Sequence, residues 1–191
     1  FVRPGTVLDE EASQRGTSTY FQDRVLPMLP ERLSNELCSL VPNEDRLTFT
    51  VEMNFDNQGR RLSNRFYRSV IRSAGRLTYT EVKRILVDRD SEARERRSEV
   101  VPFLDQMVIL ADRLQKMRRS RGSLDFDLPE PLIELDLEEG RVETIVKAER
   151  NVAHRLIEEF MIAANEAVAE FLTEQKAGMI YRIHEEPDPE R

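Results

Sequence analysis

Residues 150–165 read Arg-Asn-Val-Ala-His-Arg-Leu-Ile-Glu-Glu-Phe-Met-Ile-Ala-Ala-Asn, and the rest of the chain is best interpreted outward from them. At 100° per residue, the spacing of apolar side chains predicts an amphipathic helix over about 150–175. One stripe is apolar and consists of Val152, Leu156, Phe160, Ala163, Ala167 and Phe171. A second stripe is polar and consists of Asn151, His154, Glu158 and Asn165. The first predicts a core face, and the second has two interpretations.

The polar stripe combines amide, imidazole and carboxylate groups where most surface helices carry interchangeable Lys and Glu. Such a combination can face a ligand. It can equally be a solvated face on which His154 is an ordinary hydrogen-bonded histidine, and this is the commoner case for a polar stripe taken alone. Both interpretations stay open at this point.

Strand patterns occur on both sides of the charged middle of the chain. The alternation from Leu47 to Asn54, the turn at 57–59 and the segment 65–73 predict two antiparallel strands. Segments 132–137 and 142–146 predict a hairpin around 138–141. A last strand is expected at 179–184, after Gly178 has ended the long helix.

Two further helices are expected between the strands. Thr80 is a plausible N-cap for a short helix over 81–87, and Pro102 begins a helix to about Arg119 that Gly122 ends. Residues 1–45 are expected to be mostly irregular, and 92–101 to form a charged linker. Because strands and helices do not alternate regularly, the fold class predicted is α+β, with a mixed or antiparallel sheet packed by long helices.

Composition limits the kinds of partner. The chain has 191 residues, 39% of them hydrophobic and 34% charged, with a net charge of −7. This charge argues against a broad basic surface for nucleic acid. Segment 113–121 nevertheless carries five cations and no acid. These cations suit phosphate contacts, and they suit the solvated C-terminal end of a helix still better.

Cysteine and histidine counts exclude several chemistries. The single cysteine, Cys38, lies in the largely apolar segment Leu37-Cys38-Ser39-Leu40 and is predicted to be buried. One cysteine indicates a reducing compartment, which we take as the cytoplasm. With only His154 and His184 beside it, no usual Cys/His zinc site is possible. The pairs Asp88/Asp90 and Asp125/Asp127 are weak metal candidates.

Several motifs follow one another in a recognisable order. They are 15–21 (Arg-Gly-Thr-Ser-Thr-Tyr-Phe), 23–30 (Asp-Arg-Val-Leu-Pro-Met-Leu-Pro), 33–40 (Leu-Ser-Asn-Glu-Leu-Cys-Ser-Leu), 70–73, 76–79 (Arg-Leu-Thr-Tyr), 122–126, 129–130, the 150–165 helix and 181–185. Together they resemble the RNB catalytic domain of the ribonuclease II and ribonuclease R exoribonuclease family. The segments 76–79 and 121–126 are closer to the ribonuclease R branch.

The resemblance implies an activity. Family members degrade single-stranded RNA processively from its 3′ end and release nucleoside 5′-monophosphates, and an aspartate cluster holds Mg²⁺. In the family this cluster precedes the segment matched here, and an arginine-bearing block follows it. We therefore expect residues 1–191 to be a single incomplete domain, the middle of an RNB domain, without catalytic or metal-binding residues and inactive alone.

The resemblance assigns RNA contacts to Tyr79, Phe126 and Glu158. Tyr79 and Phe126 would stack on bases near the 3′ end, and the Glu158 carboxylate would accept a hydrogen bond from a ribose 2′-hydroxyl. The alternatives are core aromatics and a structural helix acid. His184-Glu185 is interpreted as structural.

Three function classes remain open from sequence. The protein is part of an active exoribonuclease, an RNB-like protein that binds RNA or a protein partner without catalysis, or a domain with no nucleic-acid role. The joint presence of Tyr79, Phe126 and Glu158 disfavours the third class.

Overall fold

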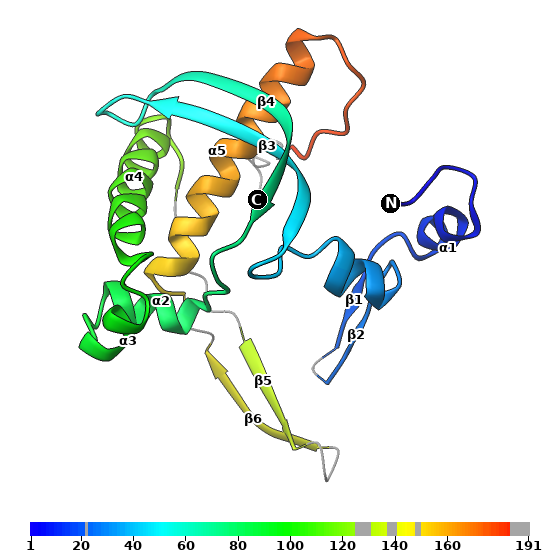
Figure 1. Ribbon diagram of the computed structural model, residues 1–191, viewed down its shortest axis with the longest axis horizontal. Helices are drawn as coiled ribbons and strands as arrows, with labels where there is room; N and C mark the ends of the chain where they lie inside the picture. Colours follow the sequence, from blue (N-terminus) through cyan, green and yellow to red (C-terminus); the bar gives the residue numbers. More distant parts are fainter. Residues whose placement is uncertain (22, 125–130, 137–140, 148–149, 184–191) are drawn as a thin grey trace, which may run out of the picture. The chain divides into compact units, whose positions relative to one another are not determined.

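The computed structural model describes residues 1–21, 23–124, 131–136, 141–147 and 150–183 (Figure 1). The chain is α+β, and within these residues the strands form three separate two-stranded pairs, β1 with β2, β3 with β4 and β5 with β6. The elements in order are α1 (Val7–Arg15), β1 (Thr19–Tyr20), β2 (Val25–Leu26), the π-helical η1 (Arg32–Leu37), β3 (Asp45–Phe55), β4 (Arg61–Arg72), α2 (Tyr79–Leu86), α3 (Ser91–Arg96), α4 (Val101–Ser120), β5 (Pro131–Asp136), β6 (Arg141–Lys147) and α5 (Val152–Glu174).

The chain divides into two compact units, each made from three stretches of sequence. The first unit comprises Phe1–Thr50, Arg68–Val82 and Leu124–Asn151. The second comprises Val51–Tyr67, Lys83–Ser123 and Val152–Arg191. None of the helices in the described part of the chain has the length and apolar character that crossing a membrane requires.

The core of the second unit lies where α4 and α5 pack against each other. Its buried apolar side chains are Ile85, Leu86, Ala93, Val101, Leu104, Ala111, Ala153, Leu156, Ala163 and Ala167. The alanines of α5 allow close approach of α4, and each larger aliphatic side chain contributes about 1.5–3 kcal/mol when it leaves water. The predicted inward residues of α4 are confirmed, with Leu104 and Ala111 buried and Val108 and Leu114 half-buried.

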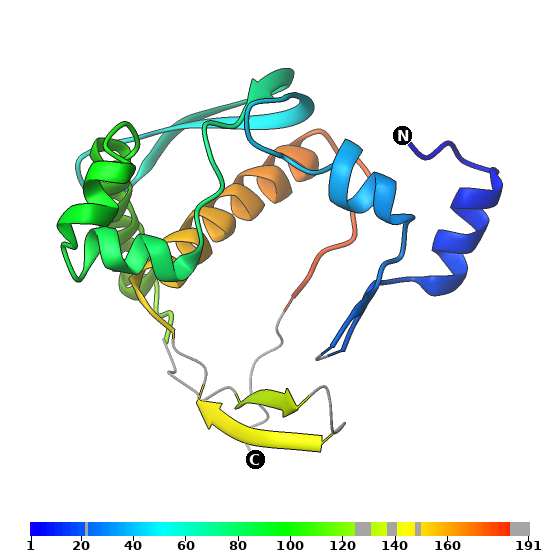
Figure 2. The same cartoon turned by 60° about the horizontal axis from the view of Figure 1, so that its bottom comes forward.

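The β3–β4 pair is the antiparallel hairpin that the sequence predicts. The cross-strand side-chain hydrogen bonds show that the strands are antiparallel, because the partner on β4 comes earlier in the chain as the residue on β3 comes later. Asp45 bonds to Arg72 at 2.8 Å, Thr48 to Ser69 at 2.7 Å and Asn54 to Ser63 at 2.9 Å. The turn closes because the Asp56 carboxylate accepts from the backbone N–H groups of Gln58 and Arg60. These bonds, the Arg60 backbone bond first, lower the pKa of Asp56. The predicted antiparallel pairing of the two later strands is confirmed by β5 and β6 (Figure 2), while residues 137–140, which include most of the turn predicted between them, lie outside the described residues.

Helix capping explains where two helix predictions were wrong. The Thr78 hydroxyl accepts from the Glu81 backbone N–H at 3.2 Å, so α2 begins at Tyr79 and Thr80 lies inside the helix. The predicted inward residues of α2 are buried. The predicted charged linker contains α3, because the Asp90 carboxylate accepts from the Ala93 backbone N–H at 2.9 Å.

The expectation of a mostly irregular N-terminal segment was wrong for α1. Thr6 accepts from the Asp9 backbone N–H at the start, and Gly16, with φ of 68°, ends the helix by donating to the Ala12 carbonyl. Cys38 was also predicted wrongly, since it follows the exposed η1 and is itself exposed.

The chain after α5 differs from the prediction as well. The helix ends at Glu174, and Lys176 takes the left-handed conformation, with φ of 53°, before Gly178 is reached. Residues 179–183 do not form the expected strand, and His184 lies outside the described residues. The Tyr181 hydroxyl instead shares a 2.6 Å hydrogen bond with Thr173 at the end of α5.

Candidate functional site

The two stripes predicted for the long helix are present on α5. Leu156, Ala163 and Ala167 of the apolar stripe are buried, and Val152 and Phe160 are half-buried. Phe171 lies at the edge of this face, with its ring centroid 4.6 Å from that of Phe66. On the polar stripe, His154 and Glu158 are half-buried and Asn165 is exposed, while Asn151 precedes the first turn.

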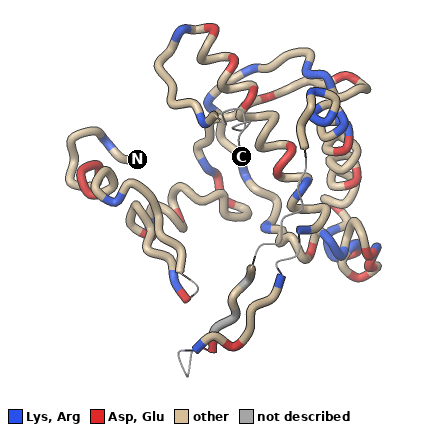
Figure 3. Tube along the Cα trace, turned by 180° about the vertical axis from the view of Figure 1, so that it is seen from behind, with Lys and Arg blue, Asp and Glu red and all other residues tan. Residues whose placement is uncertain are grey.

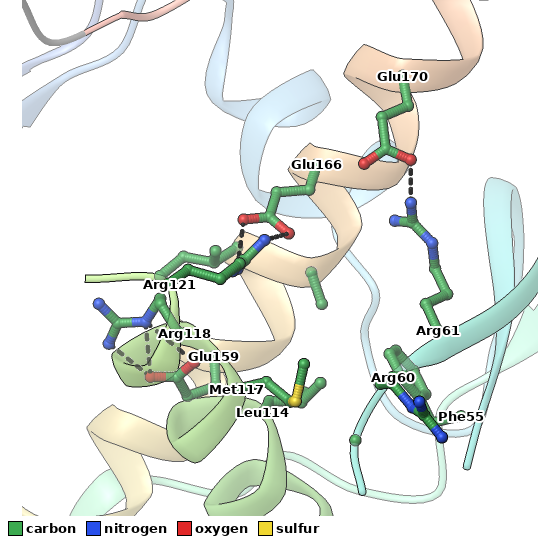
Figure 4. Close-up of a pocket in the computed structure, with 13 residues that line it drawn as sticks. Phe55, Arg60, Arg61, Leu114, Met117, Arg118, Arg121, Glu159, Glu166 and Glu170 are labelled. Atoms are coloured by element: carbon green, nitrogen blue, oxygen red, sulfur yellow. Dashed lines mark hydrogen bonds and ion pairs between the residues drawn. The ribbon is translucent and has the colours of Figure 1, made fainter. Parts of the chain in front are cut away.

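A carboxylate that sequence reasoning missed lies within the apolar face. Glu159 is only 4% exposed and accepts from the Arg118 guanidinium of α4 (Figure 4). Arg118 Nη2 lies 2.6 Å from Glu159 Oε1, and Arg118 Nε lies 3.2 and 3.3 Å from the two carboxylate oxygens. A buried carboxylate requires such a partner, because an unpaired charge is costly in an apolar setting.

Two further carboxylates of α5 lie on the same face and also contact arginines. Glu166 pairs with Arg121 at 2.9 Å, and Glu170 pairs with Arg61 of β4. The acids follow one another at spacings of seven and four residues, which places them on one side of a helix. This spacing, together with the cations of α4, is the sequence signal that could have identified the face.

The three ion pairs line a cavity of about 220 Å³ in the second unit. Apolar walls come from β3, α4 and α5, including Phe55, Leu114, Met117 and Ile162. Arg118 of α4 and Arg121, the residue after α4, each have the guanidinium directed at an α5 carboxylate in Figure 4. The site is therefore charge-compensated, and it does not offer a free cationic pocket.

The basic segment 113–121 contains one arginine, Arg118, that differs from the expected solvated helix end. Figure 3 shows where Lys and Arg (blue) and Asp and Glu (red) lie along the trace. The Arg118 side chain is only 16% exposed and pairs with α5, as does Arg121. Arg118 therefore departs from the predicted solvated helix end, whereas Arg121, with a side chain 56% exposed, agrees with it.

The three residues proposed to contact RNA fall in different parts of the chain. Tyr79 is the first residue of α2, in the first unit, and is 46% exposed, which a core aromatic would not be. Glu158 lies on α5 in the second unit, with a side chain 39% exposed and 3.8 Å from Arg118 Nη2. Phe126 lies outside the described residues.

The metal candidates predicted from the sequence do not gather into a cluster of three possible ligands in the described residues. Mg²⁺ needs several oxygen ligands, and within 1–21, 23–124, 131–136, 141–147 and 150–183 no three His, Cys, Asp or Glu side chains gather. Asp90 is engaged with the α3 N-terminus and with Arg84, whose Nη2 lies 2.7 Å away. The second candidate pair, Asp125/Asp127, lies outside the described residues.

Comparison with known proteins identifies a family whose members are similar to this chain. The family profile described as "RNB domain" matches residues 1–191. Ribonuclease R of Aquifex aeolicus is 48% identical over 191 residues, and ribonuclease R of Thermotoga maritima is 47% identical over 194, each match covering 100% of this chain. The chain spans about a quarter of the length of these relatives, 27% and 26% respectively.

A solved structure has the same fold. Mycoplasma genitalium RNase R in complex with ribose methylated single-stranded RNA superimposes with a TM-score of 0.88 at 35% identity. The match covers 97% of this chain and 29% of that one. The predicted α+β class and the predicted family are both confirmed by these similarities.

Proposed function

This chain belongs to the RNB domain family, and on that premise we propose that it is a segment of a 3′-to-5′ exoribonuclease of the ribonuclease R type. The observation that carries the proposal is the 48% identity to a ribonuclease R over the whole chain. The protein would hydrolyse single-stranded RNA processively to nucleoside 5′-monophosphates. The RNA-bound Mycoplasma genitalium relative supports single-stranded RNA as the partner.

Glu158 would recognise the sugar at the 3′ end of the RNA, and the aromatic residues Tyr79 and Phe126 would recognise its bases. A carboxylate accepts a hydrogen bond from a 2′-hydroxyl, which DNA lacks, so Glu158 would select the sugar. Tyr79 and Phe126 would stack on bases, which reads no sequence and suits an enzyme that digests any RNA. The half-buried position of Glu158 on α5 and the exposure of the Tyr79 ring support these roles.

Metal chemistry would come from elsewhere in the protein. We propose Mg²⁺ as the cofactor because of the family resemblance, with its aspartate ligands expected upstream of the segment matched here. We also propose the cytoplasm as the location, in keeping with the single cysteine and with the bacterial relatives.

The test compares RNA with DNA in the full-length protein. A hydrogen bond to a charged group contributes on the order of 1.5–3 kcal/mol, so Glu158→Ala should narrow the preference for an RNA 3′ end roughly ten- to a hundredfold. Single-turnover cleavage of matched RNA and DNA ends measures this ratio. Glu174→Ala, which removes an exposed acid from the end of the same helix, is the matched control.

The remaining outcomes separate the alternatives. Phe126→Ala should weaken cleavage of both ends, because stacking does not sense the 2′ position. Equal losses on RNA and DNA for Glu158→Ala would make that acid structural. RNA binding by the full-length protein without release of mononucleotides would favour the non-catalytic class. The isolated 191-residue chain serves as the blank, and we expect it to release no nucleotide.

A further inference from the structure

Arg118 joins three parts of the second unit. Its side chain bonds to the buried Glu159 on α5, and its Nη1 donates to Ser123 Oγ at 2.7 Å. Its backbone carbonyl accepts from the Ser123 backbone N–H at 3.3 Å, in the turn that ends α4. Ser123 is therefore held by both the main chain and the side chain of one residue.

Hydrogen bonds to residues other than Glu158 hold the Arg118 guanidinium in place. Its planar array of donors matches the Glu159 carboxylate, and Ser123 fixes its other edge, so little freedom remains. Its Nη2 lies 3.8 Å from Glu158 Oε1. A positive charge at this distance attracts the carboxylate and restricts where it rests.

Helix geometry explains why this arrangement separates two adjacent acids. Successive residues of a helix are 100° apart, so Glu159 faces the core while Glu158 faces its edge. The side chains are 4% and 39% exposed, respectively. Arg118 contacts both acids. The buried Glu159 carboxylate holds the guanidinium, and the guanidinium restrains the accessible Glu158 carboxylate.

We infer that Arg118 is a positioning residue for sugar selection, which sets the Glu158 carboxylate where it accepts from a ribose 2′-hydroxyl. The inference rests on the proposed function, because it assigns Arg118 an action through Glu158. Glu159 and Ser123 are the supports that hold the guanidinium.

The neighbouring ion pair provides a matched control. Arg121 also lies at the end of α4 and pairs with an α5 carboxylate, Glu166, at 2.9 Å. Arg121→Met thus removes an ion pair to α5 that lies two turns along the helix and is more exposed, with side chains 56% and 42% exposed. It should leave the RNA-to-DNA cleavage ratio unchanged.

The experiment measures single-turnover cleavage of matched RNA and DNA 3′ ends by four full-length variants. They are Arg118→Met, Arg121→Met, Glu158→Ala and the Arg118→Met/Glu158→Ala double variant.

Arg118→Met should lower the RNA-to-DNA cleavage ratio at least fivefold. The ratio for the double variant should be no lower than the ratio for Glu158→Ala, because both substitutions act through one carboxylate. Arg118→Lys, which keeps the charge without the planar donors, should be intermediate. Because Arg118→Met leaves Glu159 buried without its partner, Arg118→Met/Glu159→Met, which removes both charges, is tested for the same loss with the fold preserved.

Each result has one meaning. Equal loss on RNA and DNA, an effect as large for Arg121→Met, or additive effects in the double variant would overturn the positioning role. An unchanged ratio in Glu158→Ala would overturn sugar selection by Glu158 and the positioning role with it. If Glu158→Ala lowers the ratio while both Arg118→Met and the double methionine variant retain it, the proposed function stands and the inference fails.

Discussion

Asp90 shows how a single carboxylate sets local structure. It accepts from the backbone N–H of Ala93 and from the guanidinium of Arg84, and these bonds, the backbone one first, hold the pKa of Asp90 below its ordinary value. The same contact raises the pKa of Arg84. Sequence reasoning treated Asp90 as a weak metal candidate, and the cap at α3 explains its position instead.

A pH-dependent stability follows for Asp90. Because its pKa is lowered in the folded state, its contribution is present above the unfolded value of about 3.9 and is lost as pH falls through the lowered value. Asp90→Asn should therefore lower the free energy of unfolding at pH 7. In this variant the free energy of unfolding should also decrease less than in the wild type as the pH falls below about 4. Urea unfolding at several pH values measures this. Glu92→Gln, at an exposed ion pair with Arg96 in the same helix, is the control and should change stability little.

The two adjacent acids of α5 mark the limit of sequence analysis at this scale. The polar stripe pointed to Glu158, and its partial exposure agrees with that interpretation. Glu159 falls among Leu156 and Ala163 on the same helical projection, and a charge within an apolar stripe signals a buried partner. That the partner is Arg118 depends on how α4 packs on α5, which no local pattern contains.

Among the elements, those with long periodic patterns were predictable. The α4 and α5 helices and the β3–β4 hairpin were recovered because their periods of 3.6 and 2 repeat over many residues. The short α1 and α3 were missed because their ends depend on single capping bonds from Thr6 and Asp90. Residues 179–183 do not form the expected last strand, because no strand in the described part of the chain pairs with them.

The turn between β3 and β4 gives a prediction for one element. Gly59 has φ of +82°, and a Cβ placed there would lie 2.9 Å from the carbonyl carbon and oxygen of Arg113 on α4. Backbone atoms do not give way easily, so Gly59→Ala should destabilise the chain by about 1–3 kcal/mol. Chemical denaturation measures the loss.

Gly122→Ala is the matched control for that turn. Gly122 also has a positive φ, of +93°, but no atom lies within 4 Å of an added Cβ. It therefore reports the conformational cost alone, on the order of 1 kcal/mol. Equal losses for the two variants would contradict the close approach at Gly59.

At the scale of the whole chain, large apolar side chains remain exposed in both units. Leu47 and Phe49 of β3 are 75% and 73% exposed, and Phe103 of α4 is 69% exposed. Exposed apolar surface of this kind promotes association. We predict that the isolated 191 residues self-associate or unfold in part. Light scattering and calorimetry test this, and a monodisperse monomer with one sharp transition would contradict it.

The interleaving of the two units has a consequence for how this region can be inherited. Each unit takes three separate stretches of the chain, so the polypeptide passes from one to the other five times. Exchange of a contiguous block of coding sequence that ends inside residues 1–191 leaves at least one unit with stretches from two different relatives. A crossover near Thr50, Tyr67 or Val82 should therefore join stretches of one unit that come from two different relatives, and chimaeras with such crossovers should be less stable than either parent.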